Sequence, residues 1–227
     1  MPTCGMVPKV NLINKCHCDH ESKFNKQMHK HSPPRKKCKR YNTLGHAHEL
    51  TFSTYRQKGY FEDTFLCDLF LEELDKTRNE LHYSLWAYVV MPTHIHLLVW
   101  PQQQDTYHIS QFLNHVKGRT AGRYREHLQQ NAPEKYARFL VLFRGAKSFR
   151  LWQRGGGFDR NMVHSKAIYN AIRYIEANPV QAKLVSAPEE WKWSSAYARK
   201  KGMGVLPDVL QLPIEMMNPQ KQRIGIV

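Results

Sequence analysis

The sequence predicts an α+β fold, a ferredoxin-like sandwich whose antiparallel sheet has helices on one face and whose elements follow the order βαββαβα. Two observations lead to this prediction. Segments with apolar residues at helical spacing alternate along the chain with shorter segments rich in β-branched and aromatic residues. In addition, Met91-Pro92-Thr93 separates two adjacent segments of the second kind, which favours an antiparallel hairpin because proline is disfavoured within a central strand.

The first predicted elements are a strand, a helix and the hairpin. Residues 46–56 alternate well enough for a strand, and one side of it carries His48, Leu50, Phe52 and Thr54. Residues 61–80 have apolar side chains at helical spacing, with acidic residues on the opposite side. The hairpin strands are expected over 82–90 and 94–100 because both runs are rich in β-branched and aromatic residues.

The second half of the pattern begins with a basic helix over 108–130. Residues 139–153 contain two apolar runs, of which one or both should be strands, and Gly155-Gly156-Gly157 then interrupts the pattern. Residues 164–177 predict a helix with an apolar stripe. Asn178-Pro179 is expected to end this helix, because the residue before a proline is pushed out of the helical region.

The chain is expected to have one folded domain, over 45–200, between two irregular extensions. Residues 1–44 are basic and show no apolar period, so we expect them to be mostly disordered. They also contain zinc-capable residues: Cys16, His17, Cys18, Asp19, His20, His29, His31 and Cys38. Cys-x-Cys is tighter than usual zinc spacing, so a disordered basic arm is favoured over a zinc knuckle. Residues 188–200 suggest a short amphipathic segment, and 201–227 an irregular tail.

Charge points to a polyanionic partner. The net charge is +15, and residues 106–160 alone carry eleven Lys and Arg against three acids, giving +8 inside the folded part. A basic face within a domain is typical of nucleic-acid binders. No apolar stretch is long enough to span a membrane, and the five cysteines do not resemble a secreted disulfide framework, so a cytoplasmic protein is expected.

The most informative motif is His94-Ile95-His96 within an apolar run. Strand side chains alternate, so both imidazoles should project from one face while Ile95 points into the core. Two neutral imidazoles about 6–7 Å apart at their backbones can hold one metal ion. A closed structural zinc site usually needs four protein ligands, so this pair needs a third ligand and leaves positions open for a substrate.

A helix segment supplies a third ligand and a nucleophile. Tyr174 and Asn178 are four residues apart and therefore share one helix face. Asn178 offers a carbonyl oxygen that suits a hard divalent ion. Tyr174 offers a phenol that could attack a phosphodiester polarised by the ion and form a covalent phosphotyrosine. Spacing alone does not place this helix beside the hairpin.

These segments carry a resemblance to a known family. Residues 87–99 resemble the histidine–hydrophobic–histidine (HUH) motif of single-tyrosine, insertion-sequence 200-like transposases, and residues 174–185 resemble their tyrosine-helix motif. Residues 188–195, with 151–154 and 158–160, resemble segments of the REP-associated tyrosine transposase branch. Together the similar segments span about residues 46–198 in the family's order.

The resemblance implies a function and a site. His94 and His96 match the family's metal-binding histidines, Tyr174 its nucleophile, and Asn178 the position of its third metal ligand. It implies Mg²⁺ or Mn²⁺, cleavage of single-stranded DNA next to REP-like hairpins through a 5′-phosphotyrosine, and a nucleoid-associated bacterial protein. A monomer is expected, with a homodimer as the alternative. Thr93, Lys183 and the three glycines depart from the family pattern.

Basic and aromatic residues around the predicted site are expected to contact nucleic acid. On the basic helix these are Lys117, Arg119 and Arg123, and in the segment before the tyrosine helix they are Arg150, Trp152, Arg154 and Arg160. For Trp152 a place in the core is the competing interpretation, and for the helix residues a solvated face.

Two other functions remain open at this point. A transposase relative that no longer cuts could serve as a binding module for hairpin DNA or RNA. A histidine phosphoesterase also uses His-x-His, but its histidine-triad version has a third alternating histidine, and position 98 is leucine. Retention of DNA on the protein separates a strand transferase from both.

Overall fold

The computed structural model describes residues 41–102, 107–143, 145–155 and 157–208. The chain divides into two units, Met1–Lys36 and Lys37–Val227, and every described residue belongs to the second. The zinc-capable residues between Cys16 and Cys38 lie outside the described residues. The domain boundaries expected at 44/45 and 200/201 therefore stay predictions. Residues 41–44 have no regular structure, but Tyr107 donates a hydrogen bond to the Thr43 carbonyl at 2.8 Å.

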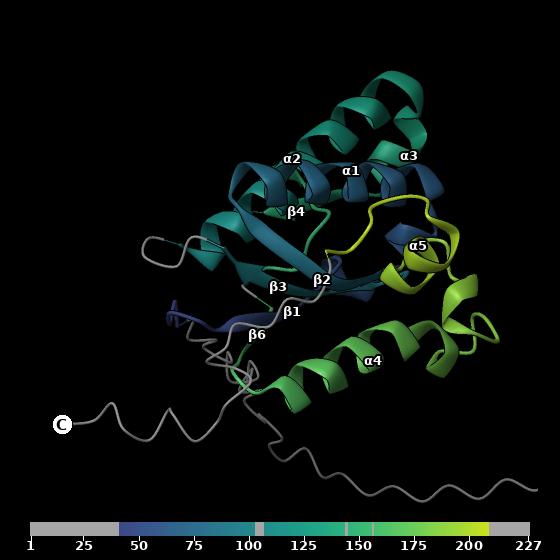
Figure 1. Ribbon diagram of the computed structural model, residues 1–227. Coiled ribbons are helices and arrows are strands. Elements are labelled where there is room, and N and C mark those ends of the chain that lie inside the picture. The colour runs from purple at the N-terminus through teal and green to yellow at the C-terminus, as the bar shows by residue number, and fades with distance from the viewer. Residues whose placement is uncertain (1–40, 103–106, 144, 156, 209–227) are drawn as a thin grey trace, which may run out of the picture. The chain divides into compact units, whose positions relative to one another are not determined.

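A four-stranded antiparallel sheet forms the centre of the fold, in the order β2-β3-β1-β6 (Figure 1). Its strands are β1 (Ala47–Ser53), β2 (Tyr83–Val90), β3 (His94–Pro101) and β6 (Phe158–Met162). The predicted hairpin is confirmed: β2 and β3 pair antiparallel, and the Met91 N–H donates to the His94 carbonyl at 2.9 Å across the turn. The α+β class and the predicted order of the elements are confirmed as well.

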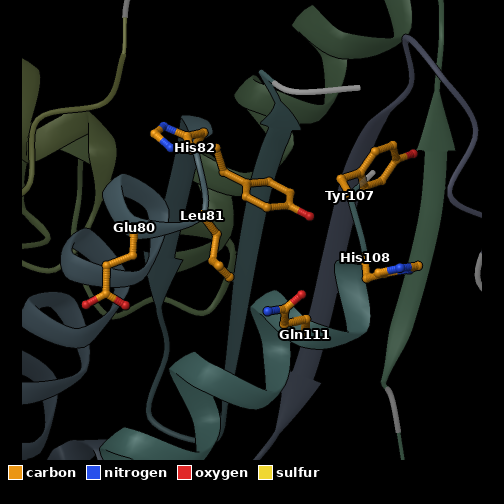
Figure 2. Close-up of a pocket in the computed structure, with 7 residues that line it drawn as sticks. Glu80, Leu81, His82, Tyr107, His108 and Gln111 are labelled. Carbon is orange, nitrogen blue, oxygen red and sulfur yellow. The ribbon is translucent and has the colours of Figure 1, made fainter. Parts of the chain in front are cut away.

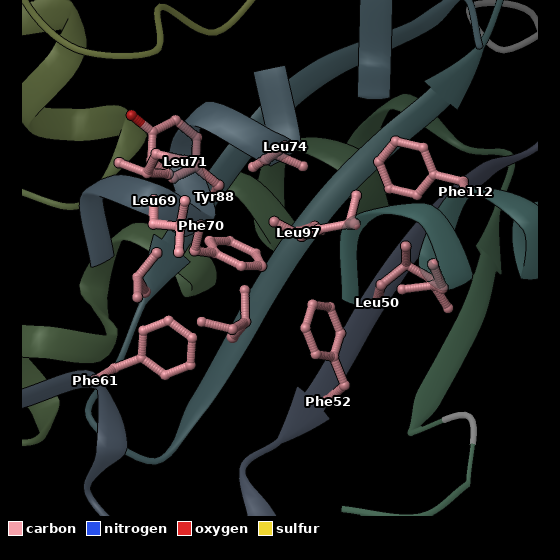
Figure 3. Packing of buried hydrophobic residues seen from close by; sticks show 14 of the residues in the cluster. Leu50, Phe52, Phe61, Leu69, Phe70, Leu71, Leu74, Tyr88, Leu97 and Phe112 are labelled. Carbon is pink, nitrogen blue, oxygen red and sulfur yellow. The ribbon is translucent and has the colours of Figure 1, made fainter. Parts of the chain in front are cut away.

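Two long helices cover one face of the sheet. These are α1 (Thr64–Glu80), whose first turn is capped by the Asp63 carboxylate accepting from the Phe65 N–H, and α2 (Ile109–Asn131). Their apolar stripes pack on the strands to form the larger core, which includes Leu50, Phe52, Phe70, Leu97 and Phe112 (Figure 3). Burial of this apolar surface supplies the main stabilisation of the fold.

The opposite face of the sheet is covered by α4 (Ser165–Gln181), so the helices do not lie on one face as predicted (Figure 1). Ile168 and Ile175 of α4 form a second core with Val89 and Leu98 of the strands. Every residue of β2 is buried, and its side chains contribute to both cores. A strand buried on both faces has a continuous apolar run instead of alternation, and such a run calls for helices on both faces.

The fourth strand of the sheet is not in the segment where it was predicted. In residues 139–153, β4 (Leu140–Phe143) and β5 (Ala146–Phe149) pair with each other in a separate two-stranded sheet, after the short helix α3 (Pro133–Ala137). The fourth strand is β6, with the sequence Phe-Asp-Arg-Asn-Met. This edge strand has few apolar residues and two charges, as edge strands often do, so its strand signal is weak.

The predicted end of the tyrosine helix at Asn178-Pro179 is wrong, because α4 continues through Pro179 to Gln181. Proline has no N–H to donate to the carbonyl four residues earlier, which here is that of Ile175. The Asn178 side-chain Nδ2 donates to this carbonyl at 3.3 Å and to the Tyr174 carbonyl at 2.8 Å. Asn178 thus replaces the donor that Pro179 lacks.

The segment after α4 fixes this helix to the sheet. It contains a short 3-10 turn (η3, Pro188–Glu190) and α5 (Ser195–Lys201). The Glu176 carboxylate of α4 accepts from Ser195 and pairs with Arg199. The Ser195 hydroxyl accepts from the backbone N–H of Tyr88 in β2. In the described part of the chain, no helix is long and apolar enough to cross a membrane.

Candidate active site

His94 and His96 lie on β3 and project from one face of the sheet, as the sequence predicts. Their ring centroids are 4.8 Å apart, with the ring planes at 84°. Ile95 between them is buried in the larger core on the opposite face. The strand alternation therefore places both imidazoles on the face that α4 covers.

A threonine hydroxyl contacts Nδ1 of each imidazole. Thr51 lies opposite His96 in the register between β1 and β3, and its Oγ1 is 2.8 Å from His96 Nδ1. Thr93 Oγ1 is 2.9 Å from His94 Nδ1. A hydroxyl that accepts from Nδ1–H leaves the lone pair on Nε2, which is how a metal-binding histidine is oriented. Thr93, a departure from the family pattern, thus has a defined contact.

Burial keeps both imidazoles neutral. It lowers the pKa of His94 below 6.5, and it lowers the pKa of His96 to about 4, with a further lowering by His94. At neutral pH the rings are therefore unprotonated, which is the form that binds a metal ion.

Acid is expected to destabilise the metal-free protein through His96. In the unfolded chain this imidazole has a pKa near 6.5, and in the folded protein about 4, so the unfolded state binds more protons between these values. The free energy of unfolding should therefore fall as the pH is lowered through this window, by about 2 kcal/mol between about pH 7 and pH 5. Urea unfolding in the presence of a chelator measures this, and His96→Gln should remove most of the difference. An equal pH dependence in both proteins would contradict it.

Tyr174 lies beside the histidine pair. Its ring centroid is 5.7 Å from that of His96, with the ring planes at 86°. Tyr174 is 46% exposed, so it is also accessible to a substrate from solution. The arrangement thus places a phenol within reach of the imidazoles, which the spacing of the motifs alone left open.

Asn178 lies one helical turn after Tyr174 and is buried. Its two hydrogen bonds to backbone carbonyls both come from Nδ2. Its Oδ1 is the atom that a metal ion would use. In the described part of the chain, no group of three or more His, Cys, Asp or Glu residues is placed to hold a metal ion. A metal bound by the histidine pair would therefore need an oxygen donor of another kind, such as this amide.

A cavity opens beside Tyr174 and His96. Its walls are formed by these two residues and by Glu49, Thr51, Phe158 and Arg160. Glu49 is buried, and its Oε2 accepts from Arg160 Nε at 2.8 Å. Of the predicted nucleic-acid residues, Arg160 is the one in this cavity, and His94 and Asn178 are not part of its wall.

Glu49 and Thr51 are site residues that the sequence did not predict. In residues 46–56 the side with Leu50 and Phe52 is apolar, as expected of a side that faces a core. The other side, with Glu49, Thr51 and Ser53, is polar and looks like a solvated face. Whether this side shares a face of the sheet with the histidines depends on the register between β1 and β3, in which Thr51 lies opposite His96. His48, on the apolar side, is buried and hydrogen-bonded to Asp159 and Tyr107.

The other predicted nucleic-acid residues lie elsewhere. Trp152 packs edge-on against Phe52 at 5.3 Å, and its indole N–H donates to the Lys117 carbonyl at 2.9 Å. The Lys117 ammonium lies 5.4 Å from the Phe52 ring centroid. These two residues border the larger core on the α1 and α2 side of the sheet.

Arg119 and Arg123 of α2 pair with acidic residues of α1. Arg119 contacts Glu80 at 2.5 Å, and Arg123 contacts Glu73 at 2.6 Å. Arg150 is half-buried after β5, and Arg154 is exposed just before Gly155. Nucleic-acid binding by these residues and by Lys117 and Trp152 stays a prediction. The acidic partners of α1 reduce the charge that Arg119 and Arg123 offer to a phosphate.

A second cavity lies between the end of α1 and the start of α2. Figure 2 shows Tyr107, His108 and Gln111 on one side and Glu80, Leu81 and His82 on the other. Tyr83 completes its wall. It contains none of the predicted site residues and shares no residue with the cavity at Tyr174.

Comparison with known proteins identifies a family for this chain. The family model described as "Transposase IS200 like" matches residues 42–178, a range that includes both histidines, Tyr174 and Asn178. No curated protein matches the chain.

Among solved structures, a REP-associated tyrosine transposase bound to a REP hairpin is similar, with a TM-score of 0.54 and 15% identity over 77% of this chain and 92% of that one. A putative transposase from Deinococcus radiodurans has a TM-score of 0.37 and 21% identity, over 61% of this chain and 95% of that one. The first of these likenesses shows a common fold. Because the family model covers more than half of the chain, the protein belongs to the IS200-like family of transposases.

Proposed function

We propose that the protein is a metal-dependent endonuclease and strand transferase that cuts single-stranded DNA next to hairpins through a 5′-phosphotyrosine. The observation that carries the proposal is the placement of the Tyr174 ring 5.7 Å from the ring of His96, at a cavity that both residues line. The structurally similar REP-associated transposase is bound to a REP hairpin, which supports a hairpin as the partner.

The residues present fit a divalent ion. His94 and His96 are neutral at pH 7, and the threonine contacts at Nδ1 favour ligation through Nε2. With Asn178 Oδ1 as the third ligand, the set would consist of two nitrogens and one oxygen. Such a set leaves positions free for phosphate oxygens, which suits Mg²⁺ or Mn²⁺ better than a structural zinc ion. When bound there, the ion would polarise the scissile phosphate as a Lewis acid.

In this mechanism the chain supplies the nucleophile and the positioning. The Tyr174 phenol oxygen attacks phosphorus and gives up its proton, while the bond from phosphorus to the 3′-oxygen breaks. The 3′-oxygen takes up a proton and leaves as a hydroxyl, and the 5′-phosphate stays on Tyr174. Because the new ester retains the phosphodiester bond energy, another 3′-hydroxyl can attack it and restore Tyr174.

The metal-dependent adduct tests this proposal. The protein is incubated with a labelled pool of single-stranded DNA hairpins with randomised flanks, with Mn²⁺ or with a chelator. Labelled DNA should stay on the protein after denaturation in Mn²⁺ and not in chelator. Tight binding with no adduct in either Mn²⁺ or Mg²⁺ would indicate a hairpin-binding module instead. Multiple-turnover release of cleaved DNA without an adduct would indicate a phosphoesterase.

A further inference from the structure

We propose that Arg160, held by the buried carboxylate of Glu49, binds a phosphate of the DNA strand inside the cavity beside Tyr174, and that Glu49 is the positioning residue for Arg160. The inference rests on the proposed function and adds a second cationic group to the site.

The register places this pair next to the histidines. Glu49 of β1 lies opposite Arg160 of β6, so both side chains project from the same face of the sheet. Two residues along β1, Thr51 lies opposite His96 on one side and opposite Phe158 on the other. Glu49 is therefore two residues along β1 from Thr51, which orients His96, and its side chain projects from the same face of the sheet.

The two side chains differ strongly in exposure. The Glu49 side chain is 6% exposed and the Arg160 side chain 54%. Arg160 uses Nε, at 2.8 Å, and Nη2, at 2.5 Å, and both contact the same oxygen, Oε2. A guanidinium has five N–H donors in one plane, so one edge can be held by the carboxylate while others reach a phosphate. The buried acid thus holds the arginine in one orientation at the cavity wall.

The charge pattern favours a role with phosphate. A carboxylate beside a nucleophile that attacks a polyanion would repel the substrate unless a cation neutralised it. An ion pair with one buried member is also a weak source of stability, because desolvation of the buried charge offsets the attraction. A purely structural link between β1 and β6 would therefore gain little from this pair over two apolar residues. The pair lines the same cavity as Tyr174, where its arginine can bind a phosphate of the substrate.

Glu49 itself is not placed as a metal ligand. With the two histidines it would make a group of three, and no such group among the described residues is arranged to hold a metal ion. The carboxylate Oε2 contacts Arg160 instead. Glu49 is therefore expected to act through Arg160.

The variants are chosen so that the protein still folds. Arg160→Gln alone would leave the Glu49 carboxylate buried without its partner, which is strongly destabilising. The double variant Glu49→Gln/Arg160→Gln removes both charges and preserves the shape. Arg160→Lys keeps the charge and removes the planar set of donors. Arg173→Gln is the matched control, because Arg173 is exposed next to Tyr174 but does not line the cavity.

The wild-type protein first locates its cleavage site in the hairpin pool with Mn²⁺. The rate constant of adduct formation at saturating DNA should then fall about 100-fold in the double variant and in Arg160→Lys, and less than about threefold in Arg173→Gln. The DNA is next made with a neutral methylphosphonate at the scissile phosphate or at either neighbour. If Arg160 contacts that phosphate, the deficit of the double variant should shrink to less than about threefold on one of these DNAs, since the two changes remove the same interaction.

The outcomes separate this inference from the proposed function. If the wild-type protein forms no adduct in Mn²⁺ or Mg²⁺, the proposed function fails. If it forms the adduct and the double variant is as fast, the role of Arg160 is wrong and the proposed function stands. A deficit of the same size on all the DNAs would also overturn the inference, because a merely structural pair would act equally on charged and neutral phosphates.

Discussion

Tyr174→Phe is expected to lose the covalent protein–DNA adduct, with a decrease of at least about 1,000-fold, while it binds hairpin DNA as tightly as the wild-type protein. The substitution removes one hydroxyl and retains the ring whose centroid lies 5.7 Å from that of His96. Because the side chain is 46% exposed, the fold should lose only a few tenths of a kcal/mol. The effect is therefore on the reaction and not on the shape of the site.

The same helix provides a matched control. Tyr169 is exposed to a similar extent, at 52%, and does not line the cavity. Tyr169→Phe should form the adduct at the wild-type rate. Denaturing gels with labelled hairpin DNA measure the adduct, and filter binding in chelator measures affinity. An adduct that persists in Tyr174→Phe would show that another residue is the nucleophile.

The elements around the histidine pair could be predicted because their signals are local. Strand alternation puts His94 and His96 on the same face of the sheet, and helical spacing puts Tyr174 and Asn178 on the same face of their helix. The hairpin follows from Pro92 between two apolar runs. Each of these inferences needs only a few neighbouring residues, and the family motifs are built from the same short segments.

What the sequence did not yield depends on contacts between distant segments. Glu49 belongs to the site only because of the register between β1 and its neighbours, which no short window contains. β6 is a strand because it pairs with β1, and its own five residues carry a weak signal. The helix end at Asn178 was mispredicted because the Asn178 side chain donates to the carbonyl that Pro179 leaves without a donor. Helix propensities of single residues do not indicate that a side chain can replace a missing backbone donor.

The basic helix shows the limit of charge as a signal. The excess of Lys and Arg in residues 106–160 predicts a cationic face, but Arg119 and Arg123 are paired with Glu80 and Glu73 of α1. These helices lie on the face of the sheet opposite α4. Arg160, from an edge strand, is the predicted basic residue that lines the cavity with Tyr174. Counting charges along the chain does not reveal which of them face an acid.

Gly157→Ala is expected to destabilise the fold by about 2–5 kcal/mol, because two separate costs add there. Gly157 has φ +73, a conformation that other residues adopt only with strain. A Cβ at this position would also lie 2.1 Å from the Thr51 carbonyl oxygen, which belongs to the backbone of β1 and cannot move aside cheaply. The glycine permits the close approach of β6 to β1.

Gly155→Ala separates the two costs. Gly155 also has a positive φ, +98, but a Cβ there would meet nothing within 4 Å. Gly155→Ala should therefore destabilise the fold only through the strained backbone conformation, by about 1–2 kcal/mol. Thermal unfolding measures the difference: for a domain of this size each kcal/mol lowers Tm by about 2–4 °C. Equal decreases in the two variants would contradict the clash with Thr51.

The consequence of Gly157→Ala extends to the site. Thr51 orients His96, and the strand that follows Gly157 carries Phe158 and Arg160 into the cavity wall. Pushing β6 away from β1 should therefore separate Arg160 from Glu49 and displace the contact at His96 Nδ1. Adduct formation is expected to fall more than about tenfold at a temperature where the variant is still folded, whereas Gly155→Ala should stay within about threefold of wild type. Gly157, one of the three glycines that depart from the family pattern, is then explained by the close approach of β6 to β1 rather than by contact with DNA.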